Sequence, residues 1–189
     1  MDEYFNKGVS MKKVLVLCCL LLGLPVAAQA NNDKIAPDAF ICAELVTMPM
    51  TDGGQPPIFE ALQIDGYASV GLGDTVAHPE ILAPLLTEVY TYCQAHPTDK
   101  VADIWTKARK AQTMPEGDTW QATKTKCSDY SADPDNGSGF VIWLDGYHRG
   151  KNKTEASVLE SDDTLKAFLD ACAKQPDALM LDVLAKSAK

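Results

Sequence analysis

Apolar residues recur along the chain at the spacing of amphipathic helices. Two segments place four apolar side chains at positions i, i+3, i+4 and i+7: Leu86, Val89, Tyr90 and Cys93 in the first, and Leu165, Phe168, Leu169 and Cys172 in the second. This is the period of a helix that packs one face on a core. No segment sustains the alternation of apolar and polar residues that is typical of strands. The pattern therefore predicts an all-α fold.

The chain also contains an internal repeat. Asp65-Gly66-Tyr67 recurs as Asp145-Gly146-Tyr147, and the pair Cys93 and Pro97 recurs as Cys172 and Pro176. Upstream, the segment 42–45 matches 127–130 at a larger offset, which places a longer loop in the first copy, within 47–57. Several matches in the same order indicate a duplicated unit.

Each copy is predicted to contain four helices. The first copy covers 31–111, a linker covers 112–119, and the second copy covers 120–189. The expected helices are 39–46, 58–70, 79–95 and 99–111 in the first copy, and 121–130, 139–149, 162–174 and 177–187 in the second. Thr98, Ser138 and Ser161 are predicted N-caps, because a hydroxyl can accept from a free amide of the first turn.

The first 30 residues have the features of a secretory signal peptide. Lys12 and Lys13 precede an apolar run over 14–24, and Ala28-Gln29-Ala30 follows it. A positive start, a short apolar middle and an A-x-A exit predict cleavage after Ala30, and Met11 is an alternative start. The apolar run is too short for a membrane-spanning helix. We therefore expect an exported protein that does not stay in the membrane after cleavage.

Export changes how the cysteines are interpreted. Cys18 and Cys19 lie in the leader, so four of the six cysteines remain. An even number of cysteines in an exported chain indicates disulfides, and four cysteines allow three pairings. The repeat places one cysteine of each copy in the first helix and one near the end of the third. The symmetric choice is one disulfide in each copy, Cys42–Cys93 and Cys127–Cys172.

Composition and motifs argue against several classes of function. The formal net charge of −9 is unfavourable for a nucleic-acid-binding protein. The histidines His78, His96 and His148 form no metal-ligand spacing, and no nucleophile elbow, phosphate loop or dinucleotide fingerprint is present. With all four cysteines expected in disulfides, no free thiol is left for catalysis. We expect neither an enzyme nor a cofactor or metal site.

Three motifs of the chain resemble the HdeA/HdeB periplasmic acid-stress chaperones. They are Cys127-Ser128-Asp129-Tyr130, the segment 141–147 (VIWLDGY) and the segment 90–97 (YTYCQAHP). The resemblance covers nearly all of the mature chain, once per copy. It implies two tandem HdeA-like four-helix lobes, each with one disulfide, and ATP-independent binding of unfolded periplasmic proteins at low pH. Members of the family are usually single lobes that form homodimers.

The second helix of each copy holds the candidate interface for clients or for the other lobe. The candidate residues are Ile64 and Tyr67 in the first copy, and Phe140, Trp143 and Tyr147 in the second. We expect these faces to pack together at neutral pH as an intramolecular pseudo-dimer. Asp65 and Asp145 are candidate acid sensors, but a buried aspartate bonded to nearby backbone is the favoured interpretation, with Gly66 and Gly146 allowing close helix approach.

The leading functional hypothesis is an acid-activated periplasmic holdase. The alternative is a periplasmic immunity or binding protein, similar in size and architecture to the Rap/Tai type, which blocks a secreted cell-wall amidase and so has a protein toxin as its partner. A structural periplasmic protein without clients is a third hypothesis.

Overall fold

A computed structural model describes residues 34–48, 57–115 and 120–189. The predicted signal peptide, its cleavage after Ala30, most of the loop 47–57 and the second half of the linker lie outside the described residues. The described residues belong to one compact unit.

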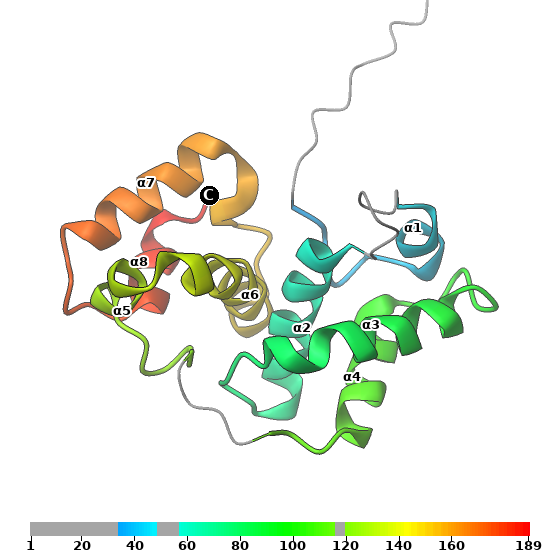
Figure 1. The fold of residues 1–189 in the computed structure, drawn as a ribbon. Coiled ribbons are helices and arrows are strands. Elements are labelled where there is room, and N and C mark those ends of the chain that lie inside the picture. The colour runs from blue at the N-terminus through cyan, green and yellow to red at the C-terminus, as the bar shows by residue number, and fades with distance from the viewer. Residues whose placement is uncertain (1–33, 49–56, 116–119) are drawn as a thin grey trace, which may run out of the picture. The chain divides into compact units, whose positions relative to one another are not determined.

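The described residues are mostly helical, which confirms the predicted fold class. Figure 1 shows α2 beside α6, with α1, α3 and α4 on the side of α2 and α5, α7 and α8 on the side of α6. In the part that the structure describes there is no strand, only three isolated bridges between extended residues. The helices are α1 (Cys42–Thr47), α2 (Ile58–Leu72), α3 (Pro79–Cys93), α4 (Val101–Ala111), α5 (Cys127–Ala132), α6 (Pro134–Asn152), α7 (Asp162–Ala173) and α8 (Met180–Ser187), with a 3-10 turn η1 (Val158–Glu160) before α7.

Several helix ends differ from the prediction. Helix α6 begins at Pro134 rather than Gly139, because the Asp133 carboxylate caps it by accepting from the backbone N–H of Asn136 at 3.4 Å. Ser138, a predicted N-cap, therefore lies inside the helix, and its hydroxyl donates to the carbonyl of Pro134 at 2.7 Å. Ser161 does cap α7, accepting from the N–H of Thr164 at 3.2 Å.

Two other helices begin closer to the C-terminus than predicted, whereas α6 begins earlier. Helix α4 begins after Lys100, so the predicted cap Thr98 lies in the preceding turn. Helix α5 begins at Cys127, because the residues before it form a turn in which the backbone N–H of Gln121 donates to the Thr125 hydroxyl at 2.8 Å.

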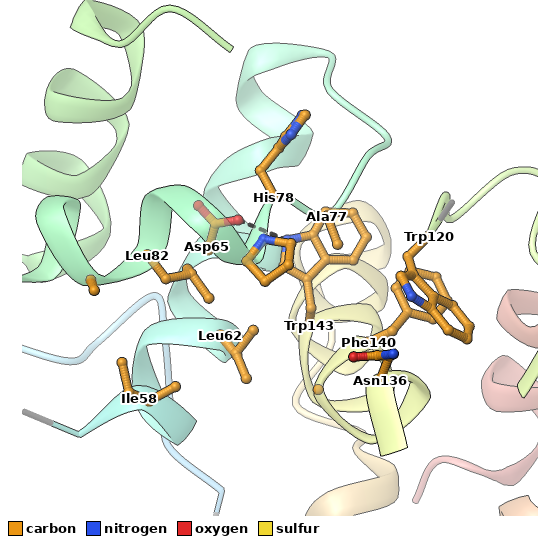
Figure 2. Close-up of a pocket in the computed structure, with 13 residues that line it drawn as sticks. Ile58, Leu62, Asp65, Ala77, His78, Leu82, Trp120, Asn136, Phe140 and Trp143 are labelled. Carbon is orange, nitrogen blue, oxygen red and sulfur yellow. Dashed lines mark hydrogen bonds between the residues drawn. The ribbon is translucent and has the colours of Figure 1, made fainter. Parts of the chain in front are cut away.

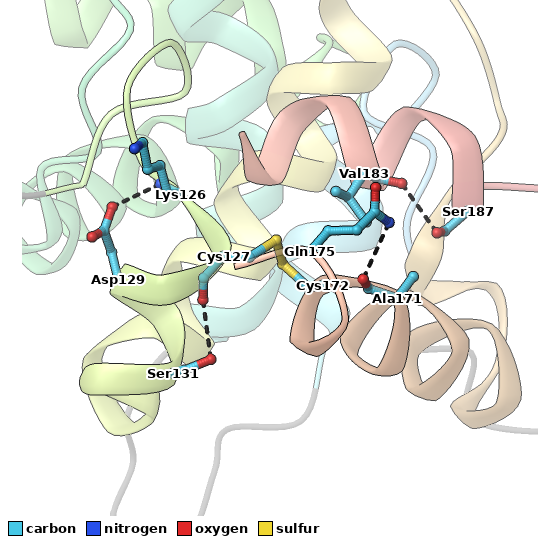
Figure 3. Close-up of a disulfide and its surroundings, with 9 residues drawn as sticks. All are labelled: Lys126, Cys127, Asp129, Ser131, Ala171, Cys172, Gln175, Val183 and Ser187. Carbon is cyan, nitrogen blue, oxygen red and sulfur yellow. Dashed lines mark hydrogen bonds between the residues drawn. A yellow bond between two sulfur atoms is a disulfide. The ribbon is translucent and has the colours of Figure 1, made fainter. Parts of the chain in front are cut away.

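Two buried disulfides anchor the short helices α1 and α5. Cys42 joins Cys93 at the end of α3, and Cys127 joins Cys172 in α7 (Figure 3). The exposed fraction of each of these cysteines is at most 2%. The disulfides hold two six-residue helices that are too short to be stable alone.

The backbone around the two disulfides makes the same bonds in both halves of the chain. The N–H of Cys42 donates to the carbonyl of Asp99 at 2.9 Å, and the N–H of Cys127 donates to that of Ala178 at 3.0 Å. Equivalent bridges join Ile41 to Lys100 and Lys126 to Leu179. The repeat seen in the sequence is therefore also a repeat of hydrogen bonds.

Candidate functional site

Helices α2 and α6 form the most extensive helix contact of the described residues, and glycines make this contact possible. A Cβ on Gly66 would overlap the carbonyl of Trp143, and a Cβ on Gly146 would overlap the carbonyl of Gln63. In each contact, the glycine of one helix meets the residue three positions before the glycine of the other helix. The two contacts are therefore equivalent, as in an isologous interface between two identical chains. The expected role of these glycines in close helix approach is confirmed.

The five candidate interface residues are largely buried around this junction. The exposed fractions are 1% for Ile64, 3% for Phe140, 0% for Trp143 and 7% for Tyr147, while Tyr67 is half-buried. The α6 aromatic rings form a row, with centroids 5.8 Å apart for Phe140 and Trp143 and 5.3 Å apart for Trp143 and Tyr147. The backbone of Tyr67 lies against Gly150 of α6.

The carboxylate of Asp65 lies at the centre of the junction and is fully buried. It accepts from the indole N–H of Trp105 on α4 and from that of Trp143 on α6, each at 2.8 Å. An Arg109 guanidinium nitrogen lies 2.6 Å from the same carboxylate. The dashed line in Figure 2 marks the bond from Trp143. Asp65 thus connects α2 to both halves through side chains, whereas bonds to nearby backbone were expected.

Arg109 extends this network toward the start of α3. Its second terminal nitrogen lies 2.6 Å from the Asp74 carboxylate, while the first, which faces Asp65, also donates to the hydroxyl of Ser69. Asp74 in turn lies 3.6 Å from the ring of His78, whose other nitrogen is 3.2 Å from Glu80. Arg109 is 1% exposed, so the network surrounds a buried cation with two carboxylates.

Burial raises the pKa of Asp65, and the nearby Arg109 and the two indole N–H groups oppose this effect. Burial also raises the pKa of Asp145, which is opposed by hydrogen bonds from the backbone of Val158 and the hydroxyl of Ser157, each 2.8 Å long. Asp145 therefore fits the expected bonding to nearby backbone. Both acids are structural groups of the core.

His148 and Arg149 lie next to each other on α6 and are buried, with exposed fractions of 5% and 1%. Arg149 donates to the carbonyl of Ile35 at 2.6 Å and to the Glu155 carboxylate at 3.0 Å. Among the residues that the structure describes, none provides a hydrogen-bond partner for the Nδ1 atom of His148. Burial lowers the pKa of His148, and the cations Arg149 and Lys151 lower it further.

An apolar pocket opens beside the Asp65 network. Its volume is about 190 Å³, and Figure 2 shows its walls. They come from the first half of α2, the start of α3, the segment 77–78, Trp120 and the first half of α6. The rings of Trp120 and Phe140 lie 5.3 Å apart, so the pocket continues the aromatic row of α6.

The sequence pattern does not mark Trp105, Arg109 or Asp74 as members of a site, and the expectation for His148 concerned only the spacing of metal ligands. One feature of the sequence could have identified Arg109 as a buried cation. The chain contains only two arginines, Arg109 and Arg149. Arg109 follows Trp105 by four residues on the apolar face of α4, where a solvated cation is not expected.

Comparison with known proteins identifies no relative: no family model, no curated protein and no solved structure matches the chain.

Within the described ranges, no helix is both long and apolar enough to cross a membrane. Among the same residues, no group of three or more His, Cys, Asp or Glu side chains is arranged to hold a metal ion. The two disulfides are typical of proteins in oxidising compartments.

Proposed function

We propose that this chain is an ATP-independent, acid-activated chaperone of the periplasm that binds acid-unfolded proteins. In this proposal, two tandem four-helix lobes act as an intramolecular pseudo-dimer, and acid loosens the contact between them. The resemblance to the HdeA/HdeB chaperones and the export leader motivate it. The observation that carries it is the buried His148 on helix α6, whose Nδ1 finds no partner within the described ranges.

Protonation of His148 favours loosening of α6. A group with a lowered pKa in the folded state contributes stability that is present above its unfolded pKa, here near 6.5, and is lost as the pH falls through the folded value. The charged groups that act on the ring are Arg149 and Lys151, both cations. A proton on His148 therefore adds a positive charge beside the buried Arg149, where burial already disfavours the charged ring.

Asp65 and Asp145 act in the opposite direction. An acid with a raised pKa in the folded state contributes stability that is fully present below its unfolded pKa and is lost as the pH rises through the folded value. Acid therefore does not break the core through these two groups. Together with the disulfides, they favour a loosened protein over a fully unfolded one at low pH.

Loosening of α6 would expose the apolar side chains that are buried at the junction. Phe140, Trp143 and Tyr147 form the aromatic row of α6, and Ile64 and Tyr67 belong to the facing helix. Large aromatic side chains supply much of the energy of apolar contacts. These five residues are the proposed client surface.

The experiment measures aggregation of an acid-denatured model protein at pH of about 2 to 3, below the reference pKa values of carboxylates, with and without this protein. We expect suppression of aggregation at equimolar amounts. No suppression even in modest excess would exclude the chaperone, and would leave the immunity or binding protein as the alternative.

A pair of variants tests the role of His148. His148→Asn removes the titrating ring, and His96→Asn is the matched control, because His96 is exposed. We expect the acid midpoint of dye binding to move to lower pH in His148→Asn and to stay unchanged in His96→Asn. Urea unfolding at neutral pH checks that both variants fold. Equal midpoints in the two variants would exclude His148 as the trigger.

A further inference from the structure

The pocket between α2, α3 and α6 lies open beside the buried network in the folded protein, before any loosening of α6. Its mouth is formed by exposed residues, among them Pro79, Ala83 and Asn136. Its walls are mostly apolar and include the rings of Trp120, Phe140 and Trp143. An apolar pocket with a few polar groups is the usual form of a ligand site.

The dimensions of the pocket match one aromatic side chain. An enclosed apolar cavity of about 150 Å³ holds benzene, and this pocket has about 190 Å³. The wall rings Trp120 and Phe140 are 5.3 Å apart, within the range at which aromatic rings attract one another. A further ring that entered the pocket could join this row.

The charged residues on the stretches that form most of the pocket wall have one sign, and the buried Asp65 of the wall is paired with Arg109. Three stretches of chain supply nearly all of its walls: 58–62, 77–83 and 133–143. These stretches contain no Lys and no Arg. Their charged residues are four acids, Glu60, Glu80, Asp133 and Asp135. An occupant with cationic neighbours would therefore be attracted to the mouth, and an acidic one repelled.

We propose that this pocket binds, at neutral pH, one aromatic side chain of a peptide segment that carries Lys or Arg beside it. The pocket is present before any acid-induced loosening, so the inference goes beyond the chaperone function proposed above. Binding at neutral pH can fail while acid-dependent suppression of aggregation succeeds, and the reverse also holds. The two proposals are thus tested separately.

Three capped peptides serve as probes: acetyl-Lys-Phe-Lys-amide, acetyl-Lys-Ala-Lys-amide and acetyl-Glu-Phe-Glu-amide. Binding to the full chain is measured at neutral pH by calorimetry and by the indole N–H signals in NMR spectra. At about 0.01 M salt we expect the Lys-Phe-Lys peptide to bind about tenfold more tightly than either of the others. The signal of Trp120 or Trp143 should move with it.

Two variants fill the pocket. Gly139→Leu places a side chain whose first carbon would lie 3.8 Å from Leu62, an ordinary contact distance, and Ala83→Trp covers the mouth from an exposed position. The matched control is Gly71→Leu, because a Cβ at Gly71 meets nothing within 4 Å. We expect about a tenfold loss of Lys-Phe-Lys binding in both filled variants and no loss in the control.

Several outcomes would overturn the proposal. They are absence of binding by the Lys-Phe-Lys peptide, equal binding of the Glu-Phe-Glu peptide, and unchanged binding in the folded filled variants. Equal binding of acetyl-phenylalanine amide would assign the pocket to small aromatic molecules instead of basic peptides. Ala83→Trp keeps the test decisive if Gly139→Leu does not fold, because residue 83 lies on the surface.

Discussion

Replacing Gly66 by alanine tests whether the close approach of α2 and α6 holds the two halves together. The new Cβ would overlap the carbonyl oxygen of Trp143 and would lie 2.9 Å from the backbone nitrogen of Tyr147. Both neighbours are backbone atoms, so no side-chain rotation can relieve the contact. The helices would have to separate, by about 1 Å or more, to restore ordinary contact distances.

The expected cost follows from three contributions. Overpacking of a well-packed interior costs about 1 to 3 kcal/mol, and the upper end applies where only backbone can move. Separation also stretches the bond from Trp143 to the buried Asp65, which costs about 1 kcal/mol or more. Alanine recovers about 1 kcal/mol through its higher helix propensity. The net destabilisation of Gly66→Ala is therefore about 3 kcal/mol.

Urea unfolding followed by tryptophan fluorescence measures this change, and Gly71→Ala provides the control in the same helix. A Cβ on Gly71 meets nothing within 4 Å, so we expect its stability to be unchanged or to rise by up to about 1 kcal/mol. With a slope of about 2 kcal/mol per molar urea, Gly66→Ala should lower the midpoint by about 1.5 M. If the two variants unfold at the same urea concentration, the packing argument is wrong.

Two further changes test the disulfides and the ion pair. Replacing Cys127 and Cys172 by alanine opens a loop with a sequence separation of 45, which costs about 4 kcal/mol in the chain-entropy model and should be seen in thermal unfolding as a large loss of stability. Asp65→Asn removes the charge from the pair with Arg109 and leaves one indole N–H facing an amide NH2 that cannot accept, so we expect about 1 to 3 kcal/mol of destabilisation at neutral pH. Because the raised pKa of Asp65 makes its contribution largest in acid, the difference from the parent chain should grow as the pH falls. A difference that shrinks in acid would contradict this sign.

The helical class could be predicted from the sequence because it depends on local spacing, and the two disulfides could be predicted because the internal repeat places the cysteines equivalently in both copies. The apolar period that includes Leu86 and Val89 reports a buried helix face without knowledge of its partner. Ser161 is a reliable cap for the same reason, since its hydroxyl bonds within its own helix start. Local signals of this kind need no tertiary information.

The start of α6 was missed because tertiary contacts override weak local propensity there. The segment 134–139 contains Pro134, Gly137 and Gly139, which propensity alone assigns to a loop. In the folded chain, a Cβ on Gly137 would lie 2.6 Å from the ring of Tyr130, so glycine allows this side chain to pack on the first turns of the helix. The contact joins α5 to α6 and is invisible in the pattern of either segment.

The Asp65 network was missed for a similar reason. Its members come from α2, α4 and α6, and the pair Asp65–Trp143 is separated by 78 residues along the chain. A sequence shows that a buried carboxylate needs partners, but it does not show which distant indole or guanidinium supplies them. The sequence did not indicate that His148, the proposed trigger, is buried, because its burial depends on the same packing.

The reciprocal contact of α2 and α6 has a consequence for how the molecule can change. When two identical chains meet through the same surface, each substitution is present on both sides at once. Here the surfaces of α2 and α6 belong to one chain, so a substitution on one helix leaves the equivalent position on the other helix unchanged. Asp65 faces the indole of Trp143, while the position related by exchange to Trp143 is Gln63, whose side-chain oxygen accepts from the backbone of Ile35. A single chain can therefore have an aromatic pocket on one side of the junction and a closed polar contact on the other.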